Sequence, residues 1–353
     1  MELVKYPDWR KRVARHEKFL RHELDGALAI VSAPSKKTLP VPVAHHKTLA
    51  DQWVDTDFIC ECTAVNIDNI HYLGDALPIA FPNLGPDFLS SLQGCKLNFG
   101  ESTSWSEPCL IDWKYADKIH LDLETFSFKK MVEITDALIE RSRGGYIVGL
   151  TDFHPGGDNI AALRDPVNLC ADLIEHPDEV KKLLLRTEPW YFQVYDFFYE
   201  KTKSAGHPCT SWTPFVVFGK YYIPSNDFSC MVSKEMFDEF FLEGIRRECR
   251  YLDYSIYHLD GPNARRHLDS LLGIKELDAI QWVPGAGQDQ CKKWMDLYRK
   301  IQSAGKAVQL GPENTGDLEV IFRELKPELS AIIMQAPSLE AGQDIVRRIQ
   351  KWK

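Results

Sequence analysis

Residues 253–312 read DYSIYHLDGPNARRHLDSLLGIKELDAIQWVPGAGQDQCKKWMDLYRKIQSAGKAVQLGP and repeat one unit. In each unit a short apolar run is followed by turn-forming residues, and then by a stretch with apolar residues at helical spacing, as at 263–272 and 289–304. The strands expected here are 253–258, 277–283 and 306–310. Strands that alternate with helices pair in parallel, because each crossover helix returns the chain to the same end of the sheet. This stretch therefore predicts an α/β fold.

The same unit recurs towards the C-terminus. A helix is expected at 316–325, a strand at 330–335, and a final helix at 338–352. Ser338 immediately precedes the last helical stretch and is a suitable N-cap residue.

The unit also recurs towards the N-terminus. We expect a strand at 145–150 before a helical region at 159–205, and a strand at 226–232 before a helix at 233–250. Weaker strand candidates lie at 27–31 and 118–121. Eight strands alternating with helices predict a (β/α)8 TIM barrel, since no G-x-G-x-x-G turn follows the first strand as a dinucleotide-binding sheet requires.

The chain is expected to form a single barrel domain over 1–353, with 1–110 as an irregular, proline-rich N-terminal elaboration. Within it, the segment 72–86 is rich in turn formers. Two interpretations of this segment stay open: a lid over the site and a purely structural loop.

Composition limits the class of protein. Of the 353 residues, 44% are hydrophobic and 26% charged, the formal net charge is -9, and no long block of like charge offers a surface for nucleic acid. No apolar run approaches the roughly 20 residues of a membrane span. The charged N-terminus and nine scattered cysteines predict a cytoplasmic protein with reduced thiols.

Ionisable residues gather where the expected strands end. In a TIM barrel the chemistry lies at the carboxyl ends of the strands, where the loops converge. The catalytic candidates at these ends are Asp152, His154, Asp227 and Glu313. Asp227 is equally compatible with capping a turn, and Glu313 with a solvated loop position.

His258-Leu259-Asp260 is the sharpest motif. Side chains at i and i+2 on a strand project from the same face, so His258 and Asp260 are placed to bind one divalent metal ion. The competing interpretation is a histidine hydrogen-bonded to its neighbouring carboxylate for loop architecture. Asp152 and His154 share this spacing and this ambiguity.

Aromatic residues near these positions are the candidates for substrate binding, because flat apolar walls with a few polar groups suit an aromatic, sugar or tetrapyrrole-like ligand. They are Trp105, Trp212, Tyr257 and Trp282. The alternative is that they fill the core and the rim of the barrel.

Several stretches resemble the uroporphyrinogen decarboxylase superfamily over roughly 145–353. They are GYIVGLTD at 145–152, LRD at 163–165, NDF at 226–228 and YHLDG at 257–261. The resemblance implies a (β/α)8 barrel of the uroporphyrinogen decarboxylase type. It does not extend to the decarboxylases' N-terminal Arg-Gln-Ala-Gly-Arg motif, which has no counterpart in 1–42, so a heme-pathway decarboxylase is disfavoured.

The chain is more similar to the branch of zinc-dependent methyltransferases that work with a corrinoid protein. Their His-x-Cys-Gly motif corresponds to His258-Leu259-Asp260-Gly261, so that Asp260 replaces the first cysteine ligand. The last strand, which ends at 334–337, carries no second cysteine. A site with a carboxylate is harder than one with thiolates and is a stronger Lewis acid towards oxygen.

The resemblance thus implies a metal-assisted methyltransferase. It would move a methyl group between a small, methoxylated substrate and a corrinoid protein, with zinc at His258 and Asp260 and with Asp227 or Glu313 as a further ligand. The alternatives are a carboxylate-based hydrolase or lyase acting on a sugar or ring, a decarboxylase, and a non-catalytic binding barrel. The sequence also allows a homodimer.

Overall fold

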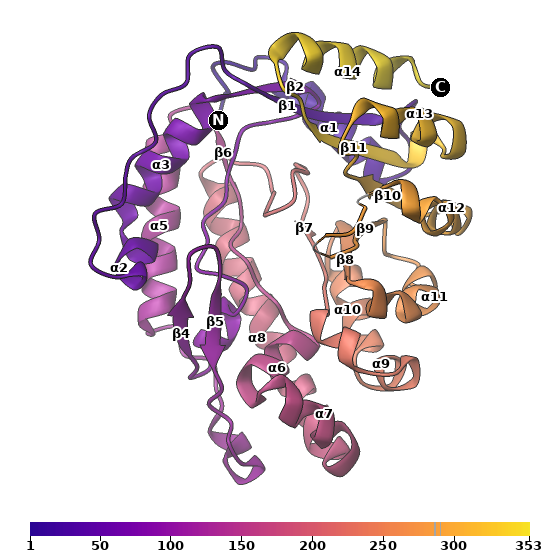
Figure 1. Ribbon diagram of the computed structural model, residues 1–353. Coiled ribbons are helices and arrows are strands. Elements are labelled where there is room, and N and C mark those ends of the chain that lie inside the picture. Colours follow the sequence, from indigo (N-terminus) through magenta and orange to yellow (C-terminus); the bar gives the residue numbers. More distant parts are fainter. Residues whose placement is uncertain (286, 290) are drawn as a thin grey trace.

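The computed structural model describes residues 1–353 except 286 and 290. Its main element is a seven-stranded sheet in the order β2-β1-β11-β10-β9-β8-β7 (Figure 1). All neighbouring strands are parallel except β1 and β2. The strands are β1 (Leu28–Pro34), β2 (Ile70–Gly74), β7 (Tyr221–Tyr222), β8 (Tyr254–Asp260), β9 (Ala279–Val283), β10 (Ala307–Leu310) and β11 (Ser330–Gln335).

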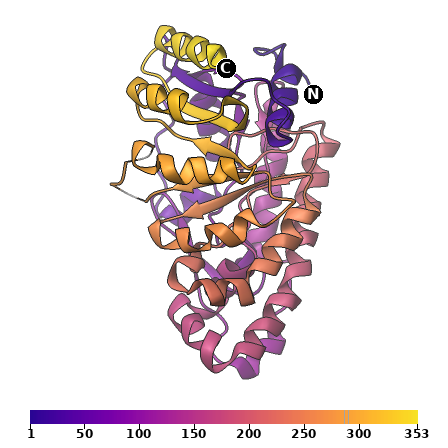
Figure 2. The same ribbon diagram turned by 90° about the vertical axis from the view of Figure 1, so that its right-hand side faces the viewer.

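Helices connect the parallel strands and cover their outer face (Figure 1). These helices are α9 (Lys234–Phe240), α10 (Leu242–Tyr251), α11 (Leu268–Leu272), α12 (Met295–Ser303), α13 (Thr315–Glu324) and α14 (Leu339–Lys351). In Figure 2 they form successive layers, from yellow (α14) at the top to orange further down. The predicted N-cap is confirmed, because the Ser338 side chain accepts the backbone N–H of Ala341.

A second parallel pair, β3 (Ile79–Ala80) with β6 (Ile147–Val148), lies outside the large sheet. No ladder among the described residues joins this pair to the seven strands. The α/β class with a large parallel sheet is therefore confirmed, whereas the closed eight-stranded barrel stays a prediction.

Two expected strands are wrong. Residues 226–232 contain a 3₁₀ helix, η2 (Asp227–Met231), and the strand is the earlier β7. The carboxylate of Asp158 accepts the N–H groups of Asp227 and Phe228, which satisfies this backbone without a sheet partner. The other, 118–121, begins on the last residue of η1 (Trp113–Lys118) and continues as irregular chain.

The helical region expected at 159–205 is three helices. They are α6 (Gly156–Arg164), α7 (Pro166–Glu175) and α8 (Pro177–Ser204). Pro166 and Pro177 stand at the first helical position, where the missing N–H costs nothing, so each starts a new helix. Likewise, the helix expected at 289–304 is η4 (Lys292–Trp294) followed by α12, and Gln290 lies outside the described residues.

The N-terminal part is more regular than expected. Besides β1, β2 and β3 it contains α1 (Trp9–Leu20), α2 (Leu49–Val54), α3 (Thr56–Asp68), α4 (Phe88–Ser91) and the hairpin β4 (Lys96–Phe99) and β5 (Ser104–Glu107). Further along, α5 (Phe126–Ser142) packs against α3 (Figure 1). The single-domain organisation stays a prediction.

The strands of the large sheet bury side chains on both faces. On β8, Tyr257 and Leu259 belong to a core cluster that includes Leu268 of α11, whereas Tyr254 and Ile256 belong to the cluster on the other face. This alternation assigns His258 and Asp260 to the face opposite Tyr257. No described helix is long and apolar enough to cross a membrane.

Replacing Asp278 by Asn is expected to stabilise the protein at pH 8. Burial raises the pKa of Asp278 to about 7, although the N–H of Ser255 and the charges of Lys306 and Arg21 favour the carboxylate. The folded state therefore holds this proton more tightly than the unfolded chain. The proton on Asp278 therefore stabilises the folded state. This contribution is complete below the pKa of Asp278 in the unfolded chain, about 3.9, and is lost as the pH rises through 7.

Asparagine does not ionise, so Asp278→Asn keeps its stability as the pH rises. Its side-chain oxygen can still accept the 2.8 Å hydrogen bond from the N–H of Ser255. We expect the thermal midpoint at pH 8 to rise by about 2–4 °C, with little change at pH 4. Calorimetry at the two pH values checks this. A lower midpoint at pH 8 would mean that the attraction of the ionised carboxylate to Lys306 outweighs its burial.

Candidate functional site

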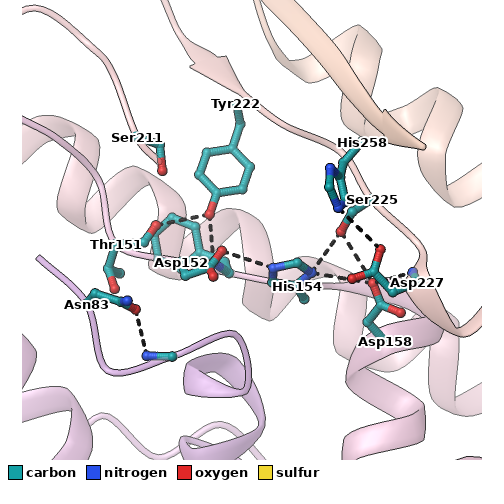
Figure 3. A network of polar contacts seen from close by, with 12 residues as sticks. Asn83, Thr151, Asp152, His154, Asp158, Ser211, Tyr222, Ser225, Asp227 and His258 are labelled. Carbon is teal, nitrogen blue, oxygen red and sulfur yellow. Dashed lines mark hydrogen bonds and ion pairs between the residues drawn. The ribbon is translucent and has the colours of Figure 1, made fainter. Parts of the chain in front are cut away.

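The end of β8 brings three candidate metal ligands together. The ligand atoms of Asp227, His258 and Asp260 all lie within 4.8 Å of one another. His258 and Asp260 come from β8, and Asp227 is the first residue of η2. Nε2 of His258 and Oδ1 of Asp227 are 3.8 Å apart (Figure 3).

His258 is held so that one ring nitrogen stays free. Its Nδ1–H donates a 2.7 Å hydrogen bond to Oε1 of Gln281, its register partner on β9. The edge of the ring meets Trp212, with centroids 5.1 Å apart. In the tautomer with the proton on Nδ1, the lone pair of Nε2 faces Asp227. This is the tautomer of histidine that can bind a metal ion through Nε2.

A second group of ionisable residues surrounds His154, which follows β6. Nε2 of His154 lies 3.0 Å from Oδ1 of Asp152, and Nδ1 lies 2.8 Å from Oγ of Ser225 and 3.4 Å from Oδ2 of Asp158. The loop is fixed by Tyr222 of β7, whose hydroxyl donates to the carbonyl of Thr151 and accepts the N–H of Phe153 (Figure 3).

The start of α6 must come very close to the loop before η2. A Cβ on Gly157 would lie 2.5 Å from Oδ1 of Asn226, so any other residue there would have to displace the Asn226 side chain. This approach lets Asp158, in the first turn of α6, accept the N–H groups of Asp227 at 3.0 Å and Phe228 at 2.8 Å. The cluster around His154 thereby positions the backbone of the candidate ligand Asp227.

The carboxylates around His154 determine its protonation state. Burial lowers the pKa of His154, but the carboxylates of Asp152 and Asp158 raise it by more, so this pKa lies well above its ordinary value. Burial raises the pKa of Asp158, but His154 and the two backbone N–H groups lower it by more. His154 is therefore an imidazolium between carboxylates, without a lone pair for a metal ion.

The possible ligand atoms of Asp158, His154 and Asp227 also lie within 4.8 Å of one another, so these residues form a second candidate metal group. The protonation of His154 makes it the weaker of the two groups. Burial and the nearby carboxylate of Asp158 raise the pKa of Asp227 to about 6. With 46% of its side chain exposed, Asp227 is the candidate ligand most open to solvent and substrate.

A pocket of about 500 Å³ opens beside this cluster. Its wall includes His154, Asp158 and Asp227 together with Trp105 of β5 and Phe228. Asp227 thus belongs both to the pocket and to the stronger metal group. Pro86, at the end of the predicted lid 72–86, also lines the pocket, while the closing of this segment stays a prediction.

The structure brings most of the predicted site residues together. Asp152, His154, Asp227, His258 and Asp260 form the two groups described above, Trp212 contacts His258, and Trp105 lines the pocket. Their roles stay predictions. Glu313 does not join them among the described residues: it is exposed in the loop after β10, and its backbone N–H donates to Asp317.

Tyr257 and Trp282 require a correction. They are 1% and 4% exposed and lie in the core cluster beneath the helices, where Trp282 packs against Trp294 with centroids 5.1 Å apart. The cause is the alternation of a strand: if His258 faces the site, its neighbour Tyr257 faces away. Neither residue can line the pocket.

Three residues were missed by the sequence analysis, namely Asp158, Ser225 and Gln281. Asp158 carried a signal, because it is only four residues from His154, in the first turn of the helix that begins two residues after that histidine. Ser225 and Gln281 carried none, since their contacts with histidines are 71 and 23 residues away in the chain.

Comparisons with known proteins bear on the fold. No family model matches the sequence, and no curated protein matches it either. The structure is similar to a methyltransferase from Methanosarcina mazei, with a TM-score of 0.59, 10% sequence identity, and coverage of 96% of this chain and 97% of that chain. At this identity the likeness shows a shared fold over nearly the whole chain, and membership of the uroporphyrinogen decarboxylase superfamily stays a prediction.

Proposed function

We propose that this protein is a metal-assisted methyltransferase that removes a methyl group from a small methoxylated compound and passes it to a corrinoid protein. The observation that carries the proposal is the convergence of Asp227, His258 and Asp260 at the end of β8, with their ligand atoms within 4.8 Å. The shared fold with a methyltransferase and the sequence resemblance support the class of reaction.

The three residues fit a zinc ion. Ligand atoms around a tetrahedral zinc ion with bonds of about 2.0–2.2 Å are separated by roughly 3.3–3.6 Å. Nε2 of His258 and Oδ1 of Asp227 are already 3.8 Å apart. One nitrogen and two carboxylate donors leave a fourth position for a substrate oxygen, and a bound ion would supply Lewis acidity there.

The pocket fits the substrate of this reaction. Its volume of about 500 Å³ lies within the ~300–1,000 Å³ range of small-molecule sites. Trp105, Phe228 and Met231 offer apolar surface for a ring, and Asp227 stands at the side of the metal group. A methoxy oxygen on such a ring would point towards the metal ligands.

The chain's own residues hold this arrangement rigid. Gln281 keeps Nδ1 of His258 protonated, and Asp158 anchors the backbone that carries Asp227. The imidazolium of His154 offsets one of the two negative charges of Asp152 and Asp158 next to the pocket. The positive charge of His154 reduces the repulsion between these carboxylates, so they can lie close to the carboxylates that would hold the metal ion.

Metal analysis and turnover test the proposal together. Zinc is measured in wild type, His258→Ala and Asp260→Asn after equilibration with zinc and removal of the excess. Loss of the methyl group from a panel of methoxylated aromatic acids is followed with reduced cobalamin as acceptor. We expect about one zinc ion per wild-type chain, much less in both variants, and a parallel loss of turnover.

Glu313→Gln is the matched control, because it neutralises an exposed carboxylate of a neighbouring strand-end loop that belongs to neither group of candidate ligands. It should keep both zinc and turnover. Full turnover by metal-free protein would overturn the metal-assisted reaction. A wild-type protein that demethylates no compound of the panel would overturn methyl transfer itself and would favour the carboxylate-based hydrolase or lyase.

A further inference from the structure

Two cysteines meet at the base of the β4–β5 hairpin. The S–H of Cys95 donates to Sγ of Cys109 across 3.3 Å. Cys95 stands directly before β4 and Cys109 two residues after β5, so the pair closes the hairpin. A disulfide bond is about 2.05 Å long, so an approach of roughly 1.2 Å would form one.

The two thiols differ in a way that suits exchange. The hydrogen bond from Cys95 lowers the pKa of Cys109, which is half-buried. The same hydrogen bond and burial raise the pKa of Cys95, which is 6% exposed. Cys109 is thus the more accessible and more acidic thiol, and Cys95 lies behind it as the second partner.

We propose that Cys95 and Cys109 form a reversible thiol–disulfide site that responds to small-molecule disulfides. The thiolate of Cys109 attacks one sulfur of the small disulfide, forms a mixed disulfide and releases one small thiol. Cys95 then loses its proton, attacks Sγ of Cys109 and releases the second small thiol. The two cysteines are oxidised by two electrons, and the small disulfide is reduced to two thiols.

The position of the pair connects it to the pocket. The carbonyl of Leu163, in α6, accepts the N–H of Cys109 at 3.0 Å, and Sγ of Cys95 lies 3.6 Å from the carbonyl of Ala162. Ala162 lines the pocket, as does Trp105 in the hairpin that the pair closes. Oxidation would therefore tie the hairpin covalently at the point where it meets α6.

Peptide mapping tests the site directly. The full-length protein is equilibrated with glutathione disulfide, alkylated and digested with trypsin, which cuts after Lys96 and so separates residues 48–96, with Cys95, from 97–114, with Cys109. We expect the intact mass to fall by about 2 Da, and fragmentation of the linked peptides to place the bond between Cys95 and Cys109. Reduction with dithiothreitol should reverse both changes.

Cys62→Ala is the matched control, since Cys62 is also half-buried and shares a tryptic peptide with Cys95. It should form the bond as wild type does, whereas Cys95→Ala and Cys109→Ala should not. In Cys95→Ala, iodoacetamide should also modify Cys109 more slowly at pH 7, because the donor that favours its thiolate is lost. A bond between other cysteines, or none when other thiols are modified, would overturn the proposal.

Discussion

Asp158→Ala is expected to lower the free energy of unfolding by about 3–5 kcal/mol, because it removes one of the two carboxylates that face the buried charge of His154 and leaves only that of Asp152. The side chains of both residues are only about a tenth exposed, at 11% and 10%, so water does not replace the lost carboxylate. The N–H groups of Asp227 and Phe228 lose their acceptor in the same step. Urea unfolding at pH 7 measures the change.

Two further variants separate the charge from the hydrogen bonds. Asp158→Asn keeps an oxygen for the two N–H groups and should lose less stability than Asp158→Ala. The double variant with His154→Ala should lose less than the sum of the single losses, since it removes both charges of the pair. Additive losses would show that His154 is neutral in the folded protein.

Gln281→Leu is expected to weaken zinc binding by roughly 10–100-fold without removing any candidate ligand. The amide of Gln281 accepts the Nδ1 proton of His258 at 2.7 Å and thereby presents Nε2 to the metal position. With leucine there, the imidazole can turn and can carry its proton on either nitrogen. Competition with a chromophoric chelator measures the affinity, and a thermal scan of the metal-free protein reports its stability.

Gln309→Leu is the control, because Gln309 is the register partner of Gln281 on β10 and undergoes the same change of shape. Its Oε1 is buried and has no hydrogen-bond partner among the described residues, so its loss should leave zinc affinity unchanged. Equal affinity in wild type and Gln281→Leu would show that His258 is held by other contacts, such as Trp212. Weak binding already in wild type would instead count against the proposed metal site.

Local sequence was sufficient for the strands from β8 to the C-terminus. The runs that became β8, β9, β10 and β11 are four to seven residues long and mostly apolar, and stretches with helical periodicity separate them, so each carries its own signal. The pair His258 and Asp260 could be predicted for the same reason, since the alternation of one strand places them together. The same rule, applied once more, would have excluded Tyr257.

Elsewhere the local sequence is compatible with more than one structure. Contacts with residues far away in the chain then determine which structure forms. Residues 226–232 are apolar enough for a strand, but Asp158 binds their N–H groups and a 3₁₀ helix results. The β4–β5 hairpin and its pair of cysteines also went unrecognised, because Cys95 and Cys109 are only two of nine scattered cysteines.

Local sequence patterns were thus enough to predict the α/β class, the alternation of strands and helices from β8 onwards, and the shared face of His258 and Asp260. Only the tertiary structure decided that Asp227 completes their group, that His154 is paired with Asp152 and Asp158, and that Glu313 stays apart. The difference lies in the distance along the chain between the interacting residues. Periodicity acts between neighbours in the chain, whereas a charge or a lone pair is set by whichever groups the folded backbone brings within a few ångströms.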